Sequence, residues 1–293
     1  MIDRVRRCVE ARSADLLAAR YRAPRMVGWI DRCEPWAGGP VFEWIEGVTP
    51  ACLDCLPVSA VGALLRELHS DSRLGASLAR LGDRVTTCAE AYRRSYHERF
   101  TEDLAFIAAA PPPFVGRDTL DWMRAEAGAL ESRVLASAAF AEPADSPVHG
   151  DMWLDNLLVS GDRWYVLDWD GLGLGDRVVD WAMLFGPTQD RVRVDERQAR
   201  SAAALGAAER ERLGAYARAS LLDWIIDPLA DWVQAGSEPL HGEAVRARNG
   251  RVHREALAFY RERYGGGWAG VDEVARPPGL AQLYPRRDPC SPC

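Results

Sequence analysis

Three polar residues between positions 148 and 182 have a spacing that could support chemistry. Asp151 and Asn156 are separated by four residues in "HGDMWLDN", and Asp168 follows in "VLDWD". The segments "NLLV" and "WYVLDW" are predicted to form β-strands that are joined by the turn "SGDR". Such a hairpin would bring Asp168 beside Asn156 at one of its ends. The pattern therefore predicts a site rather than scattered surface charges.

Phosphoryl transfer from ATP is a reaction that these residue types could perform. It needs a carboxylate that orients the attacking hydroxyl and accepts its proton, and oxygen ligands that hold Mg²⁺ against the phosphates. Asp151 has the position of the base, and Asn156 and Asp168 have the positions of the two metal ligands. The D-x-D pair of Asp168 and Asp170 would also suit a metal-dependent glycosyltransferase, but nothing else in the sequence favours a nucleotide-sugar fold.

The surrounding sequence predicts a small strand-bearing start and a large helical body. "DRVRRCVEARSADLLAARY" has helical apolar spacing, and "RMVGWIDR" and "PVFEWIEG" are predicted to pair as a hairpin across "EPWAGG". Helical patterns begin at "LPVSAVGALLRELHS" and continue on both sides of the acidic stretch. The predicted hairpin with Asn156 and Asp168 is thus inserted in the middle of a helical body.

The stretch "VHGDMWLDNLLV…WYVLDWDGLGLGD" resembles the signature of the aminoglycoside phosphotransferase/choline kinase-like family. These are small-molecule kinases with a protein-kinase-like fold. "VFEWIEG" resembles the hinge of that family, where Glu43 would offer its carbonyl and Ile45 its amide to adenine. "LLRELHS" resembles the helix after the hinge, and "GDRVVDWA" resembles the family's G-D-P-x-x-D-L-A segment. The resemblance covers about residues 5 to 265.

The resemblance implies an ATP- and Mg²⁺-dependent kinase that acts on a hydroxyl of a small molecule. Asp151 would be the catalytic base, and Asn156 and Asp168 would bind the metal. His149 resembles the structural histidine of the protein-kinase catalytic loop. Asp176 and Asp180 are expected to support that loop, Asp162 lies in a turn, and the roles of Asp155 and Asp170 stay open.

The expected fold is α+β and protein-kinase-like, with a truncated N-terminal lobe of one helix and a short β-hairpin. Residues 1–46 would be the remnant of the nucleotide-binding lobe, 47–270 the mainly helical catalytic and substrate lobe, and 271–293 a disordered tail. A Gly-rich loop and a strand lysine are expected in this family, and this sequence shows neither. Either the sequence is a shortened version of a longer protein, or the chain is a pseudokinase-like binding module that lost its grip on the ATP phosphates.

A row of acidic residues in "LLDWIIDPLADW" is a candidate for substrate binding. Asp223, Asp227 and Asp231 stand four positions apart, which would form one stripe on a helix. Such a stripe could bind amines, as carboxylates near the carboxyl terminus do in aminoglycoside kinases. Pro228 is expected to interrupt the helix, however, and Trp224 and Trp232 favour the alternative that the row is only the solvated side of a buried face.

Composition narrows the class of protein further. All 36 basic residues are arginine, which excludes lysine-dependent chemistry, and the net charge of −7 argues against nucleic-acid binding. No apolar run is long enough to span a membrane, so we expect a cytoplasmic protein without a membrane partner. The two C-x-x-C pairs, in "CLDC" and at the chain end, are too far apart for a usual zinc ribbon and are expected to be reduced thiols. The sequence does not predict an oligomeric state.

Overall fold

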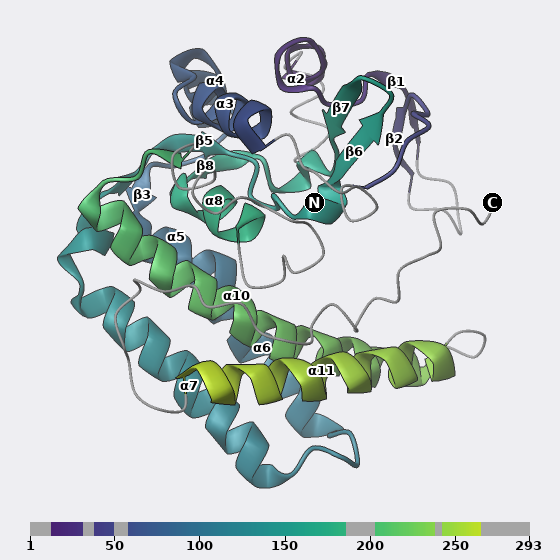
Figure 1. Cartoon of the computed structure of the whole chain (residues 1–293), viewed down its shortest axis with the longest axis vertical. Coiled ribbons are helices and arrows are strands. Elements are labelled where there is room, and N and C mark those ends of the chain that lie inside the picture. Colours follow the sequence, from purple (N-terminus) through teal and green to yellow (C-terminus); the bar gives the residue numbers. More distant parts are fainter. Residues whose placement is uncertain (1–12, 32–37, 50–57, 186–202, 238–241, 265–293) are drawn as a thin grey trace.

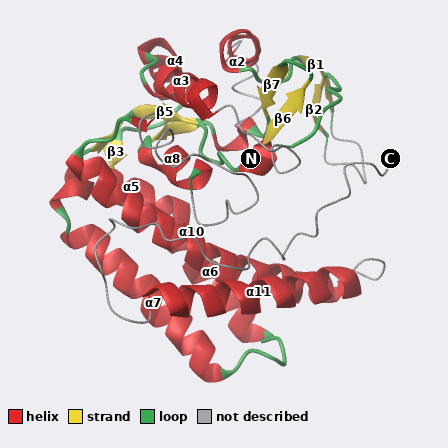
Figure 2. Ribbon diagram, viewed as in Figure 1, coloured by secondary structure: helices red, strands yellow, loops and turns green. Residues whose placement is uncertain are grey.

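The computed structural model describes residues 13–31, 38–49, 58–185, 203–237 and 242–264. Its helices are mostly gathered in one body, while the strands form four separate two-stranded sheets (Figures 1 and 2). Among the described residues, no helix combines the length and the apolar composition that a membrane crossing requires. Both C-x-x-C pairs and the tail at 271–293 lie outside the described residues.

The amino-terminal part holds one helix and one hairpin, as the sequence predicts. The helix is α2 (Ser13–Tyr21), and the strands β1 (Met26–Ile30) and β2 (Gly39–Phe42) pair antiparallel. Two backbone contacts join this part to the middle of the chain. The amide of Val166 donates to the carbonyl of Arg22, and Val48 pairs with Val159.

The larger part is built from helices that pack around an apolar core. They are α3 (Val58–His69), α4 (Ser72–Arg80), α5 (Cys88–Tyr92), α6 (Glu98–Ala109), α7 (Arg117–Ala136), α8 (Val178–Leu184), α10 (Ala207–Gln234) and α11 (Gly242–Tyr264). A π-helical turn, Arg93–His97, joins α5 to α6. In Figure 1, α10 (green) runs through the centre of this body with α11 (yellow) and α7 beside it.

Three further pairs of strands lie between the helices. The strands are β3 (Thr86–Thr87), β4 (Pro143–Ala144), β5 (Ser146–Val148), β6 (Leu157–Ser160), β7 (Arg163–Val166) and β8 (Gly173–Gly175). β6 and β7 form the predicted hairpin, in full antiparallel register from Leu157↔Val166 to Ser160↔Arg163. The pairs β3–β4 and β5–β8 were not predicted.

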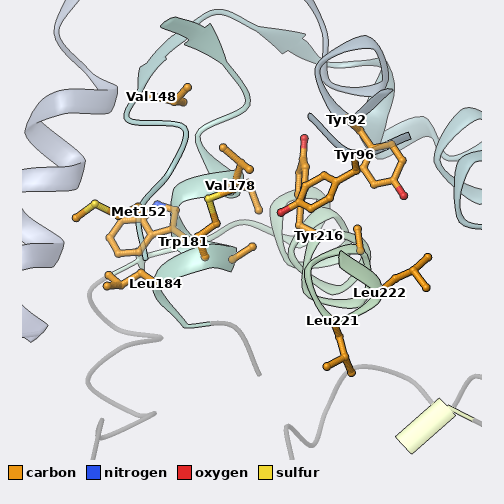
Figure 3. Packing of buried hydrophobic residues seen from close by; sticks show 14 of the residues in the cluster. Tyr92, Tyr96, Val148, Met152, Val178, Trp181, Leu184, Tyr216, Leu221 and Leu222 are labelled. Carbon is orange, nitrogen blue, oxygen red and sulfur yellow. The ribbon is translucent and has the colours of Figure 1, made fainter. Parts of the chain in front are cut away.

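Aromatic side chains fill much of the core. Figure 3 shows Tyr92, Tyr96 and Tyr216 grouped together, and Trp181 of α8 near Met152. The rings of Tyr96 and Tyr216 have centroids 6.0 Å apart, and all five of these side chains are almost fully buried. Large rings bury much apolar area each. They therefore fix α8 and α10 against the loop that follows β5.

Candidate active site

The segment after β5 carries Asp151, and Asn156 closes the same loop. The side-chain nitrogen Nδ2 of Asn156 donates to the backbone carbonyl of Asp151 at 2.7 Å and to its carboxylate oxygen Oδ2 at 2.8 Å. Asn156 therefore fixes both the backbone and the carboxylate of Asp151. Because Nδ2 faces Asp151, the amide offers its other atom, the oxygen Oδ1, as a ligand.

Asp168 stands at the end of β7, next to Asn156, as the hairpin prediction requires. The amide of Leu167 donates to the backbone carbonyl of Asn156 at 2.8 Å. Asp168 itself has a left-handed backbone, with φ 57° and ψ 65°, which is rare for a residue other than glycine. The structure thus brings Asn156 and Asp168 together and holds Asp168 in a strained conformation of the kind that clusters at functional sites.

Trp169 holds the turn that contains Asp168. Its indole nitrogen donates to the carbonyl of Val166 at 2.8 Å, and its ring lies edge-on to His149 with centroids 4.6 Å apart. The ring of Tyr21, from α2, is 6.3 Å away on another side. Sequence reasoning missed Trp169, since nothing in its local pattern separates it from other core tryptophans.

A fully buried carboxylate anchors the loop before Asp151. Asp180, on α8, accepts hydrogen bonds from the backbone amides of His149 and Gly150, both at 2.9 Å, and bonds to His69 at 2.9 Å. Burial alone would raise the pKa of Asp180, but the hydrogen bond and charge of His69, together with the bond from the amide of Gly150, outweigh burial and lower that pKa. The geometry agrees with the predicted supporting role of Asp180, and it adds His69, to which the sequence assigned no chemistry.

His149 lies inside the fold rather than in the site. It is fully buried, and its Nε2 bonds to the carbonyl of Leu167 at 2.9 Å. Burial lowers its pKa, so the ring is mainly neutral at pH 7. This position matches the structural role that the family resemblance implies for His149.

The loops that carry Asp151 and Asp168 touch through their backbones. Gly150 has a left-handed φ of +81°, and a Cβ there would lie 2.6 Å from the carbonyl oxygen of Gly171. Only glycine combines this φ with so close an approach. The glycine of "HGD" therefore lets the two loops meet.

The electrostatic environment of Asp151 suits a base. Burial is the largest influence and raises the pKa of Asp151 above its usual value, and the charge of Asp168 raises it further. The hydrogen bond from Asn156 and the nearby His149 lower it only in part. A carboxylate with a raised pKa accepts a proton more readily than an exposed one.

Two other aspartates of the acidic stretch have different surroundings. Asp176 is buried, lies 2.8 Å from Arg212 of α10 in an ion pair, and accepts a hydrogen bond from the amide of Val178, so it joins the start of α8 to α10. Asp170 is largely exposed. Some loss of hydration raises its pKa, and the charge of Asp168 raises it further.

The expected hinge follows β2. The amide of Glu43 donates to the carbonyl of Arg25 at 2.9 Å, and its carboxylate accepts from the amide of Arg25 at 2.8 Å. Ile45 is half-buried. Val48 then exchanges two backbone hydrogen bonds with Val159 of β6, at 2.9 and 2.8 Å. The candidate nucleotide-binding residues thus lie on a segment that is tied to the hairpin of Asn156 and Asp168.

The acidic row lies on α10, but its members differ. Asp223 is buried and pairs with Arg99 of α6, and its pKa is raised to about 7, mainly by burial. Asp227 and Asp231 are exposed. The expectation that Pro228 interrupts the helix is wrong, since α10 continues to Gln234. The carbonyl of Ile225, three positions before Pro228, bonds to His253 of α11 at 2.8 Å, so a neighbouring helix satisfies backbone near the proline.

Tyr96 packs against α10, the helix that carries the acidic row. Its hydroxyl bonds to Ser220 of α10 at 2.8 Å. Burial is the main cause of its raised pKa, and the charges of Asp223 and Asp151 both add to it.

The donor set at the hairpin end is compatible with Mg²⁺. Asn156 offers an amide oxygen and Asp168 an exposed carboxylate, and oxygen ligands of this kind bind Mg²⁺ through one or two protein groups plus water and phosphate. No cluster of three or more histidine, cysteine or acidic side chains that could hold a metal occurs within the described residues.

Comparisons with known proteins define the class of this chain as a phosphotransferase. The model of the phosphotransferase enzyme family matches residues 9–222. The chain belongs to that family. No curated protein sequence matches it significantly.

Solved structures share its fold at low sequence identity. The GDP and kanamycin complex of APH(2")-IIia superposes with a TM-score of 0.55 at 12% identity, covering 90% of this chain and 85% of that one. A choline/ethanolamine kinase family protein from Mesorhizobium loti gives 0.53 at 18%, covering 88% and 85%. LicA in complex with AMP gives 0.53 at 16%, covering 87% and 79%. These likenesses confirm the predicted α+β, protein-kinase-like fold with its mainly helical C-terminal lobe.

Proposed function

We propose that this chain transfers a phosphoryl group from ATP to a hydroxyl of a small molecule. The observation that carries the proposal is the contact of Asn156 with Asp151, at the end of the hairpin that also presents Asp168. Membership of the phosphotransferase enzyme family supports the same reaction type.

Asp151 acts as the catalytic base in this proposal. Its Oδ2 is held by Asn156, so the carboxylate keeps one orientation toward the acceptor. Its other oxygen accepts the hydrogen bond of the attacking hydroxyl and then its proton. The raised pKa of Asp151 favours that proton transfer. Asp180 and Gly150 do not react, but they hold the loop in which Asp151 stands.

Asn156 and Asp168 hold Mg²⁺, and the hinge binds the nucleotide base. When bound, the ion neutralises charge on the transferred phosphate. The carbonyl of Glu43 and the amide of Ile45 meet adenine. Nucleotides in two of the similar structures, GDP and AMP, support a purine-nucleotide site.

The acceptor in this proposal carries a positive charge. Asp227 and Asp231 are exposed on α10, and Asp223 of the same helix is buried. Arg99 already neutralises Asp223, so the two exposed carboxylates are the ones that attract an ammonium group. Kanamycin in one similar structure supports an aminoglycoside-like or other cationic acceptor.

Nucleotide binding and turnover test this proposal separately. Calorimetric titration with Mg·ATP should give saturable binding, and Asp168→Asn should weaken it strongly in Mg²⁺ but little in EDTA. Asp162→Asn, in the exposed turn of the same hairpin, is the matched control. No binding to the unmodified chain would contradict the kinase proposal. Binding without ADP release, across a panel of aminoglycosides, choline and amino alcohols, would instead favour the pseudokinase-like alternative.

A further inference from the structure

At Gly47, the hinge lies closer to β6 than any residue with a Cβ atom would allow. A Cβ on Gly47 would lie 2.6 Å from the backbone oxygen of Val159 and 2.9 Å from Cγ of Leu158. Real Cβ atoms do not approach a backbone oxygen to 2.6 Å. Glycine is therefore required at position 47 for contact rather than for an unusual backbone conformation.

This contact is next to a short backbone bridge. Val48 donates to the carbonyl of Val159 at 2.9 Å and accepts from its amide at 2.8 Å. In Figure 1, β6 and β7 lie beside β1 and β2. The Val48–Val159 bridge is therefore a point where the hinge meets the β6–β7 hairpin. Ile45 stands three positions before Val48, and Asn156 three positions before Val159.

We infer that Gly47 and the Val48–Val159 bridge are positioning elements that set the base-binding hinge against the metal-binding hairpin. One nucleotide must reach both places, because its base lies at the hinge and its phosphates lie at the metal. The Val48–Val159 bridge fixes the distance between the base-binding hinge and the metal-binding end of the hairpin. Gly47 permits this bridge to form. This inference rests on the proposed function, since it takes Ile45 as a base-binding residue and Asn156 as a metal-binding residue.

A positioning role differs measurably from a merely structural one. If Gly47 only stabilised the hinge, a larger residue would weaken ATP binding equally with and without Mg²⁺. If Gly47 aligns the hinge with the hairpin, the larger residue weakens ATP binding more in the presence of Mg²⁺ than in its absence. The informative quantity is therefore the ratio of the ATP dissociation constants in EDTA and in Mg²⁺, which is a coupling between two sites.

The test uses Gly47→Ala in the full chain, with calorimetric titration of ATP in Mg²⁺ and in EDTA. The Cβ of alanine would lie 2.6 Å from the oxygen of Val159, and real Cβ atoms essentially never come closer than 3.0 Å, so the hinge and β6 must move apart by a few tenths of an ångström. We expect the Kd for Mg·ATP to rise by about 10-fold or more, with a smaller change in EDTA, so that the ratio falls. Gly28→Ala is the matched control, because a Cβ there meets nothing within 4 Å.

A double variant separates backbone contact from side-chain crowding. Gly47→Ala/Leu158→Ala removes the leucine but keeps the 2.6 Å contact with the oxygen of Val159, so the reduced ratio should persist. Recovery of the ratio in the double variant would overturn the inference. So would a ratio in Gly47→Ala equal to that of Gly28→Ala. No ATP binding by the unmodified chain would overturn the proposed function and this inference with it, whereas normal binding and an unchanged ratio overturn the inference alone.

Discussion

Replacing Asp180 by asparagine removes the charge that anchors the catalytic loop while it keeps the size of the side chain. The carboxylate is fully buried and receives three hydrogen bonds of 2.9 Å, from His69 and from the amides of His149 and Gly150. Asparagine has one oxygen and one NH₂ group, so at least one of these donors then faces another donor.

The cost follows from the price of an unsatisfied buried group. A buried donor without an acceptor costs about 1–3 kcal/mol, and bonds to a charged acceptor are worth more than neutral ones. We therefore expect Asp180→Asn to lower the free energy of unfolding by about 2–4 kcal/mol. Turnover should fall by about 10-fold or more, because Asp151 follows the loop that shifts.

The effect of Asp180→Asn should depend on pH. The pKa of Asp180 lies below its usual value in the folded state, so its stabilising effect is present above the unfolded pKa of about 3.9. It is lost as the pH falls through the folded pKa. The difference in the free energy of unfolding between the unmodified protein and Asp180→Asn should be present near neutral pH and should shrink below about pH 4.

Urea unfolding at several pH values measures this difference, with Asp162→Asn as the control. Asp162 is exposed in the turn between β6 and β7, so its variant should stay within about 0.5 kcal/mol of the unmodified protein. A loss for Asp180→Asn no larger than that of the control would refute the claim that Asp180 holds the loop.

Other substitutions test other parts of the structure. Arg212→Met leaves the buried Asp176 unpaired and should cost about 3–5 kcal/mol in urea unfolding; a loss under about 1 kcal/mol would contradict the ion pair. Asp223 has a folded pKa of about 7, above its unfolded value, so the unmodified protein should lose stability as the pH rises from about 4 to about 7, and Asp223→Asn should not. Parallel curves of stability against pH for the two proteins would contradict the raised pKa of Asp223. Gly150→Ala meets the oxygen of Gly171 at 2.6 Å and has φ +81°, so activity should be abolished and the Tm lowered, and an active, equally stable variant would refute the close contact.

The sequence was sufficient to predict the β6–β7 hairpin. Its two apolar segments and the turn "SGDR" are local signals, and local signals determine hairpin register. The placement of Asn156 beside Asp168 follows directly from that register. The structural roles expected for His149 and Asp180 came from the family resemblance rather than from spacing.

Long-range packing accounts for what the sequence could not predict. β5 and β8 have three residues each, and they pair because Gly175 lets Val148 approach closely, with 2.9 Å between Cγ2 and a hypothetical Cβ. His69 meets Asp180 across 111 positions, and Arg99 meets Asp223 across 124. No local pattern indicates such partners.

The acidic row shows how such a partner changes an interpretation. By spacing alone, Asp223, Asp227 and Asp231 are equivalent members of one stripe. In the structure, Asp223 is buried against Arg99, while the other two are exposed. Pro228 was expected to interrupt the helix, yet α10 continues through it to Gln234, with Ile225 and Leu229 buried on either side of it.

Direct detection of a phosphorylated acceptor tests the central proposal, that Asp151 promotes phosphoryl transfer to a small-molecule hydroxyl. The chain and its Asp151→Asn variant would be incubated with Mg·ATP and a panel of aminoglycosides, choline and amino alcohols, and the products followed by mass spectrometry. The account predicts a phosphorylated product from the unmodified chain that requires Mg²⁺, and none from Asp151→Asn, which should unfold at the same urea concentration. Equal product from both proteins would contradict it.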